Sequence, residues 1–163
     1  MKRIVVALLL LGISVLVGCS SQEPAATQTL EVKGVWGRNS SMAAANGAFY
    51  MTLINNTQQD EQLLSAASDA CNVVELHEMY TMDNGAMGMR PVEGGIIAIP
   101  AGQTVELKVG GMHVMCIDKT QAFEIGQEIP ITLTFANAGE MVVNAEIREE
   151  PMGEEMNMNG MGG

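Results

Sequence analysis

The sequence is poor in the residue types that most enzymes and nucleic-acid-binding proteins need. It has two histidines, six aromatic residues and 8 basic residues against 19 acidic ones among 163. The resulting net charge of −11 excludes a nucleic-acid binder that neutralises phosphates, and it disfavours attachment to anionic lipid headgroups. Because no nucleophile–base arrangement is visible either, we do not expect an enzyme. The abundant residue is methionine, which occurs 14 times.

The N-terminal residues have the features of an export signal. Two basic residues precede an apolar run over 4–17, which is shorter than a typical transmembrane helix. The run leads into Leu-Val-Gly-Cys, which is similar to the lipobox of bacterial lipoproteins, where the cysteine is diacylated. We therefore predict a lipoprotein signal peptide over 1–18, a lipid anchor on Cys19 and a polar linker over 19–29. This places the protein in the cell envelope, on the periplasmic side of a bacterial membrane. The alternative is an ordinary cleavable signal in which Cys19 is incidental.

Residues 30–148 have the pattern of an all-β domain. Short apolar stretches alternate with turn sequences, and Phe49, Met51 and Leu53 recur at every second position, as side chains on one strand face do. No segment has a helical period long enough to predict a helix. We predict an antiparallel β-sandwich or Greek-key barrel. Its ten strands are expected at Leu30–Trp36, Ala48–Asn55, Glu61–Ala67, Val73–Met79, Met87–Val92, Ile96–Ile99, Thr104–Val109, Met112–Asp118, Ile129–Phe135 and Met141–Ile147.

If Cys19 carries lipid, the domain retains two cysteines, Cys71 and Cys116. Export places them in an oxidising compartment, where a disulfide between them can form and persist. Each also lies in an apolar stretch, where a buried free thiol behaves as a small hydrophobic side chain. The sequence leaves both alternatives open, because it does not give the distance between the two residues.

Both histidines have methionine neighbours at the spacing that puts two side chains on one strand face. His77 lies two residues before Met79, and His113 lies two residues before Met115. Imidazole and thioether are neutral, soft-to-borderline ligands that suit Cu(I), whereas Ca²⁺ and Mg²⁺ favour oxygen ligands. The alternative is that these methionines only fill the core. A blue-copper electron-transfer site is disfavoured, because it needs a cysteine and two histidines at one ion and no histidine follows Cys116.

The order of these motifs resembles the PCu(A)C family of periplasmic copper chaperones. The resemblance implies a cupredoxin-like fold and a Cu(I) site formed by His77, Met89, His113 and Met115. The segments that carry the resemblance are Glu75–Met79, Gly85–Glu93, Pro100–Leu107 and Gly110–Met115. Further similarity is found at Trp36–Arg38, Gly47–Met51 and Ile131–Phe135.

Two positions depart from the pattern of that family. Glu78 stands where many members have methionine, which leaves open whether Met79 substitutes for it. Met87 is a second accessory candidate, or else a packing residue. Gly94 and Gly95 lengthen the interval between the second and third implied ligands, which we interpret as a loop extension.

The segment 149–163 differs from the domain in composition. Glycine, asparagine and glutamate surround its methionines, and it has too few apolar residues to form a core, so we predict a disordered tail. Its thioethers either capture additional copper, with Cu(II) also a candidate ion, or belong to a solvated extension. The four methionines of the tail are Met152, Met156, Met158 and Met161.

Three functions are compatible with these features. The first is a membrane-tethered Cu(I) chaperone that delivers copper toward the Cu(A) centre of a respiratory oxidase, with the Cu(A) subunit or a Sco-type assembly factor as partner, as the resemblance implies. The second is a copper-sequestering or resistance lipoprotein that buffers the metal without specific delivery. The third is a structural envelope lipoprotein with a methionine-rich core, for which copper would not raise the melting temperature.

Overall fold

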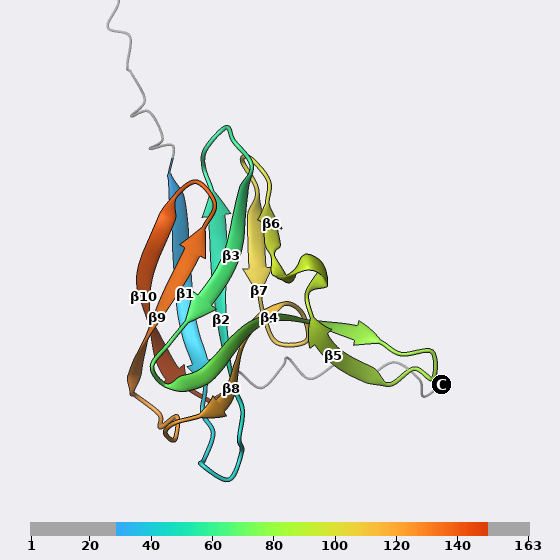
Figure 1. The fold of residues 1–163 in the computed structure, drawn as a ribbon, viewed down its shortest axis with the longest axis vertical. Helices are drawn as coiled ribbons and strands as arrows, with labels where there is room; N and C mark the ends of the chain where they lie inside the picture. Colours follow the sequence, from blue (N-terminus) through green and yellow to red (C-terminus); the bar gives the residue numbers. More distant parts are fainter. Residues whose placement is uncertain (1–28, 150–163) are drawn as a thin grey trace, which may run out of the picture.

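The computed structural model describes residues 29–149, which form ten β-strands and one 3₁₀ turn (Figure 1). All ten predicted strands are present, with ends that differ by a few residues. The predicted signal peptide, Cys19 and the four tail methionines lie outside the described residues. The strands are β1 Leu30–Arg38, β2 Gly47–Asn55, β3 Glu61–Ala67, β4 Cys71–Thr81, β5 Met87–Pro91, β6 Ile97–Ile99, β7 Thr104–Leu107, β8 His113–Lys119, β9 Glu128–Phe135 and β10 Gly139–Arg148.

The strands form one hydrogen-bonded sheet that folds over into two layers. The strand order is β5-β4-β8-β2-β1-β10-β9-β3-β6, with β7 paired to the other part of β2. Although β3 and β4 are not hydrogen-bonded neighbours, they contact each other, which closes the two layers around the core. In Figure 1, β10, β9 and β3 lie in front of β1 and β2. The β-sandwich prediction is therefore confirmed.

One pairing differs from the predicted antiparallel arrangement. Strands β1 and β10 run parallel, with Trp36 opposite Glu146 and Arg38 opposite Arg148. A parallel pair needs a long crossover connection, and here the connection is the whole of the domain between its first and last strands. The sequence pattern of each strand alone does not specify such a pair.

The described residues contain no helix long and apolar enough to cross a membrane.

The core consists of the alternating apolar residues that the sequence indicated. Phe49, Met51 and Leu53 on β2 are each at most 2% exposed. They pack against apolar side chains of β9 and β10 in the opposite layer, such as Leu133 and Ile147. Because successive side chains on a strand point to opposite faces, β2 and its neighbours also present a second face, directed away from this core.

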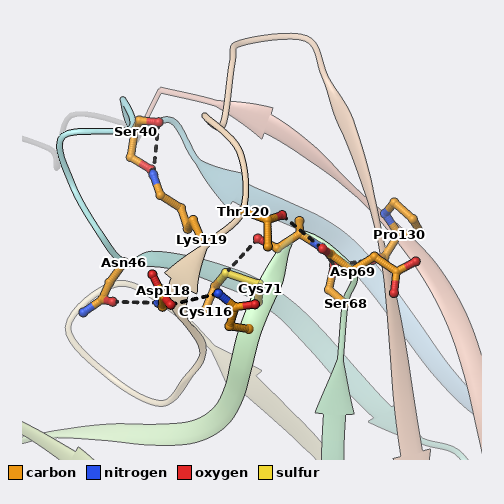
Figure 2. The surroundings of a disulfide bond; sticks show 12 residues. Ser40, Asn46, Ser68, Asp69, Cys71, Cys116, Asp118, Lys119, Thr120 and Pro130 are labelled. Atoms are coloured by element: carbon orange, nitrogen blue, oxygen red, sulfur yellow. Dashed lines mark hydrogen bonds between the residues drawn. A yellow bond between two sulfur atoms is a disulfide. The ribbon is translucent and has the colours of Figure 1, made fainter.

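A disulfide joins Cys71 on β4 to Cys116 on β8 (Figure 2). Of the two alternatives that the sequence left open, the structure contains the bonded one, with 5.4 Å between the two Cα atoms. The bond lies one residue beyond Met115, and Cys116 is fully buried. It therefore ties together the two strands that carry both histidines.

A buried lysine holds the loop between β1 and β2 against β8 at the same end of the molecule. The Nζ atom of Lys119 donates hydrogen bonds to the hydroxyl and carbonyl oxygens of Ser40 and to the carbonyl oxygen of Ser41 (Figure 2). Burial lowers the pKa of Lys119. The backbone N–H of Lys119 also donates to the Ala45 carbonyl, so both ends of this loop are fixed to β8.

Candidate metal centre

The strand register brings the predicted ligands onto one face of the sheet. On adjacent strands, His77 of β4 lies directly opposite His113 of β8. Met79 of β4 lies opposite Met89 of β5. Because side chains alternate along a strand, the buried residues next to the two histidines, Leu76 and Val114, point into the core instead. The cluster therefore lies on the face directed away from the core.

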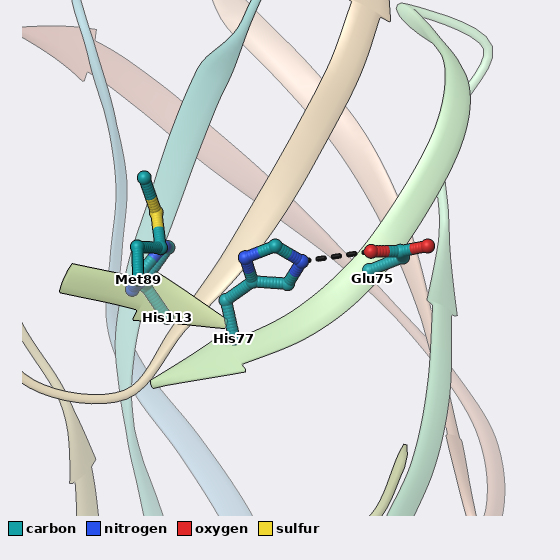
Figure 3. Close-up of polar contacts among 4 residues, drawn as sticks. All are labelled: Glu75, His77, Met89 and His113. Carbon is teal, nitrogen blue, oxygen red and sulfur yellow. Dashed lines mark hydrogen bonds and ion pairs between the residues drawn. The ribbon is translucent and has the colours of Figure 1, made fainter. Parts of the chain in front are cut away.

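His77 is buried and is held by a neighbouring carboxylate. Its Nε2 atom lies 2.7 Å from the Oε2 atom of Glu75, two residues earlier on the same strand face (Figure 3). The Nδ1 atom is buried and has no hydrogen-bond partner among the described residues. Figure 3 shows it on the side of the ring that faces Met89 and His113. A carboxylate on one ring nitrogen orients the imidazole and leaves the other nitrogen as a lone-pair donor, as is common for metal-binding histidines.

His113 is placed in the corresponding way by a backbone carbonyl. Its Nδ1 atom lies 3.1 Å from the carbonyl oxygen of Gly111, an acceptor, so Nδ1 carries the proton in the neutral ring. Its Nε2 atom then presents a lone pair to the Sδ atom of Met89, at 3.2 Å. A thioether sulfur has no proton to donate, so two donor atoms with free lone pairs face each other. When a nitrogen and a sulfur atom bind one tetrahedral metal ion, with bonds of about 2.0 and 2.3 Å, the two atoms are about 3.5 Å apart. The observed distance of 3.2 Å is close to this value.

The electrostatic surroundings of His113 favour the neutral ring. Burial lowers its pKa, the hydrogen bond with the Gly111 carbonyl partly offsets this, and the proximity of His77 lowers the pKa further. The two imidazole ring centroids are 5.9 Å apart. Only the neutral imidazole binds a metal ion, and the lowered pKa of His113 favours that form.

A surface pocket of about 490 Å³ opens at the thioether side of the cluster. Met79, Met89, His113 and Met115 line it, and His77 adjoins it through its ring contact with His113. Met115 is 8% exposed and Met89 is 47% exposed, so one thioether is set deep in the face and the other lies at the surface. The four residues implied by the resemblance are thus brought together from three strands.

The two departures from the family pattern have clear structural positions. Glu78 accepts a hydrogen bond from Arg90 and does not line the pocket, whereas Met79, one residue later, does. Met87 is 55% exposed, lies outside the pocket lining and accepts a hydrogen bond from the Thr81 hydroxyl through its sulfur. The structure therefore brings Met79, and not Met87, to the cluster. Gly94 lies within the 3₁₀ turn Glu93–Gly95 between β5 and β6, outside the strands that carry the predicted ligands.

The convergent donors here are imidazole nitrogen and thioether sulfur. Among residues 29–149, no group of three or more His, Cys, Asp or Glu side chains is arranged to hold a metal ion. The two cysteines of this part of the chain are joined in the disulfide and supply no thiolate. A cluster of neutral nitrogen and sulfur donors matches the preference of a soft monovalent ion such as Cu(I).

The structure adds two supporting groups that the ligand motifs did not include. One is Glu75, and the other is the Gly111 carbonyl, each of which fixes one imidazole. Glu75 could have been found from the sequence, because residues two apart on a strand share a face. The carbonyl could not, because its position depends on the turn that precedes β8.

We expect acid to weaken both metal binding and folding. The folded state holds the pKa of His113 below the ordinary value of 6.5, so between these two values the unfolded chain binds more protons than the folded chain. The contribution of His113 to stability is therefore present above about pH 6.5 and is lost as the pH falls toward the lowered pKa. Protonation also competes with a metal ion for Nε2. Urea unfolding and metal titration between pH 7.5 and 5 measure both effects, and an affinity independent of pH would contradict the assignment.

The fold and the site together define a β-sandwich domain with an imidazole–thioether cluster on one sheet face. Residues 30–147 match the family model "LpqE-like: Putative lipoprotein LpqE-like". The chain is 32% identical over 159 residues to "Putative lipoprotein Lxx21020" of Leifsonia xyli subsp. xyli (strain CTCB07), covering 91% of this chain and 90% of that protein. The chain belongs to the LpqE-like lipoprotein family.

Solved structures show the same fold. The solution structure of CuI-DR1885 from Deinococcus radiodurans superposes with a TM-score of 0.60 at 29% identity, covering 77% of this chain and 84% of that one. The copper-bound PCuAC domain from PmoF2 superposes with a TM-score of 0.62 at 22% identity, covering 79% and 99%. These similarities confirm the cupredoxin-like fold and the resemblance to the PCu(A)C family.

Proposed function

We propose that this domain binds Cu(I) as a cargo and carries it outside the cytoplasm. The observation that supports this most directly is the approach of His113 Nε2 to Met89 Sδ at 3.2 Å, with the buried Nδ1 atom of His77 facing the same space. Met115 supplies the fourth donor, and Met79 is the accessory one. The similarity to a DR1885 structure described as CuI-bound is consistent with the same ion.

Neutral ligands suit a carrier better than an enzyme cofactor site. They leave the monovalent ion with its positive charge, so that an acceptor with thiolate ligands binds it more strongly. The exposed thioether of Met89 gives an acceptor access to the ion at the surface. We propose that the acceptor is the Cu(A) subunit of a respiratory oxidase or a Sco-type assembly factor. A lipid on Cys19 would keep this exchange at the membrane surface.

Copper transfer tests delivery against storage. The chain without residues 1–18 is loaded with one equivalent of Cu(I) and mixed with a soluble Cu(A)-subunit domain, with and without a reduced Sco-type protein. We expect copper to appear on the acceptor after the proteins are separated, measured by metal analysis of each fraction. Copper that stays on this chain with both acceptors would instead identify a sequestering lipoprotein.

A further inference from the structure

The hairpin of β4 and β5 continues the sheet face of the metal centre outward, beyond the sandwich (Figure 1). The cross-strand pairs on this face are, from the centre outward, His77 with Pro91, Met79 with Met89, and Thr81 with Met87. We call this side of the hairpin the ligand face. Met87 lies on it one pair further out than Met89, which is about 7 Å along the strand.

The thioethers on this side of the molecule become less exposed toward the metal centre. Met87 at the outer end is 55% exposed, Met89 is 47% exposed, and Met115 in the centre is 8% exposed. Core packing therefore does not account for the two outer sulfur atoms, which an ion arriving from solvent can reach.

The opposite face of the hairpin is closed by packing. Gly88, the residue after Met87, is buried there, and a Cβ atom at Gly88 would lie 2.7 Å from the methyl carbon of Met82 and 2.8 Å from the Tyr80 ring. The guanidinium of Arg90 lies 4.7 Å from the centre of the same ring. Met82 and Met87 are thus two methionines of comparable exposure, 40% and 55%, on opposite faces of one hairpin.

The sulfur atom of Met87 is directed toward its partner across the hairpin. The Thr81 hydroxyl donates a hydrogen bond to the Met87 Sδ atom, at 3.6 Å. A thioether sulfur is a weak acceptor, so this bond is weak and is readily exchanged for a bond to a metal ion. The contact shows that the Met87 sulfur lies over the ligand face.

Three thioethers on the ligand face are close enough to bind one ion together. Met79 and Met89 are direct cross-strand partners, with Cβ atoms about 4.5–5.5 Å apart, and Met87 is the diagonal neighbour of Met79, at about 7–8 Å. Three sulfur atoms bound in a plane to one metal ion at about 2.3 Å are about 4 Å apart. The three rotatable bonds of methionine allow this approach. A site of thioethers alone selects Cu(I).

We propose that Met79, Met87 and Met89 form an outer, all-thioether Cu(I) site through which the ion enters and leaves the metal centre. The ion moves inward by ligand exchange. As the bonds from Met87 and Met79 break, bonds to the two imidazoles and to Met115 form, and Met89 keeps its bond throughout. The copper stays Cu(I), and no proton moves because every donor atom is a neutral group with a lone pair. This inference rests on the proposed Cu(I) function and gives the route of the cargo.

The test compares Met87→Leu with the matched control Met82→Leu, both in the chain without residues 1–18. Stopped-flow mixing with a weak Cu(I)–chelator complex gives the rate constant of uptake, and mixing the loaded protein with a strong chelator gives that of release. Association rates among variants of one site vary over about one to three decades, and we expect Met87→Leu to slow uptake by at least about threefold. Release should slow by the same factor, because the ion takes the same path in both directions, so the equilibrium affinity should not change. Met82→Leu should alter neither rate.

A second measurement isolates the outer site. In the variant His113→Gln with Met115→Leu, the metal centre lacks two ligands, so we expect the weak residual Cu(I) binding to be at the three thioethers. X-ray absorption of this variant should show three sulfur ligands. Adding Met87→Leu should remove one of them, whereas adding Met82→Leu should remove none.

Two outcomes would overturn the inference without affecting the proposed function. Equal uptake rates in Met87→Leu and Met82→Leu would show that the ion does not pass Met87. A lower equilibrium affinity of Met87→Leu with an unchanged uptake rate would make Met87 a ligand of the metal centre itself. The proposed function fails instead if the wild-type chain binds no Cu(I), or binds it equally well without His113 and Met115.

Discussion

Replacing His113 and Met115 together by alanine is expected to lower the Cu(I) affinity by more than about a hundredfold. Removing a residue that only supports a metal ligand costs about 10–100-fold, and these two side chains are proposed as ligands themselves. Competition with a Cu(I) chelator measures the affinity. The rise in melting temperature that Cu(I) causes by binding the folded state should also be lost.

Two controls separate loss of ligands from loss of folding. His113 and Met115 are both buried, at 4% and 8% exposure, so alanine at these positions also removes packing. The variant His113→Gln with Met115→Leu keeps most of the volume and should bind Cu(I) as poorly as the alanine variant. Met51→Leu changes a methionine in the core, 2% exposed, and should leave the affinity unchanged. Normal binding by a folded His113→Gln, Met115→Leu protein would show that the site is elsewhere.

Removing the Cys71–Cys116 disulfide is expected to lower the free energy of unfolding by about 2–5 kcal/mol. The two cysteines are 45 residues apart, and the chain-entropy model gives about 4 kcal/mol for a loop of this length. Urea unfolding of the variant with both cysteines replaced by alanine measures the change. The single variants and the reduced wild-type protein provide comparison, because all three lack the bond.

The disulfide variant also tests how firmly β8 must be held. Cys116 is the residue after Met115, and the bond connects β8 with the strand that carries His77. We expect Cu(I) affinity under native conditions to fall much less than in the ligand variants, because the hydrogen bonds between β4 and β8 still align the two histidines. Unfolding at the same urea concentration as the wild type would contradict a stabilising role for the bond.

Local pattern was sufficient to predict the strands. Phe49, Met51 and Leu53 alternate with side chains directed away from the core, and the turns between strands have their own sequence signals, so each strand could be located separately. That His77 and Met79 share one strand face, and that His113 and Met115 share another, followed from the same period of two. The parallel pair of β1 and β10 did not follow, because it depends on which strands become neighbours when the whole domain closes.

The site shows the same division between local and long-range information. Position in the motifs indicated Met89, but only the register of β4, β5 and β8 brings its sulfur to 3.2 Å from His113. The role of Met79 was undecided because two neighbouring residues, Glu78 and Met79, competed for one place. The structure shows where each side chain lies: Glu78 pairs with Arg90, and Met79 lines the pocket.

The sequence by itself determined the strand positions, the donor types and the acidic, methionine-rich character of the chain, because period, chemistry and charge are properties of short segments. Only the tertiary structure decided the disulfide, the register of the two histidines and the approach of Met89 to His113. These depend on distances between residues far apart in the sequence, which are fixed when the two layers of the sheet pack around one core.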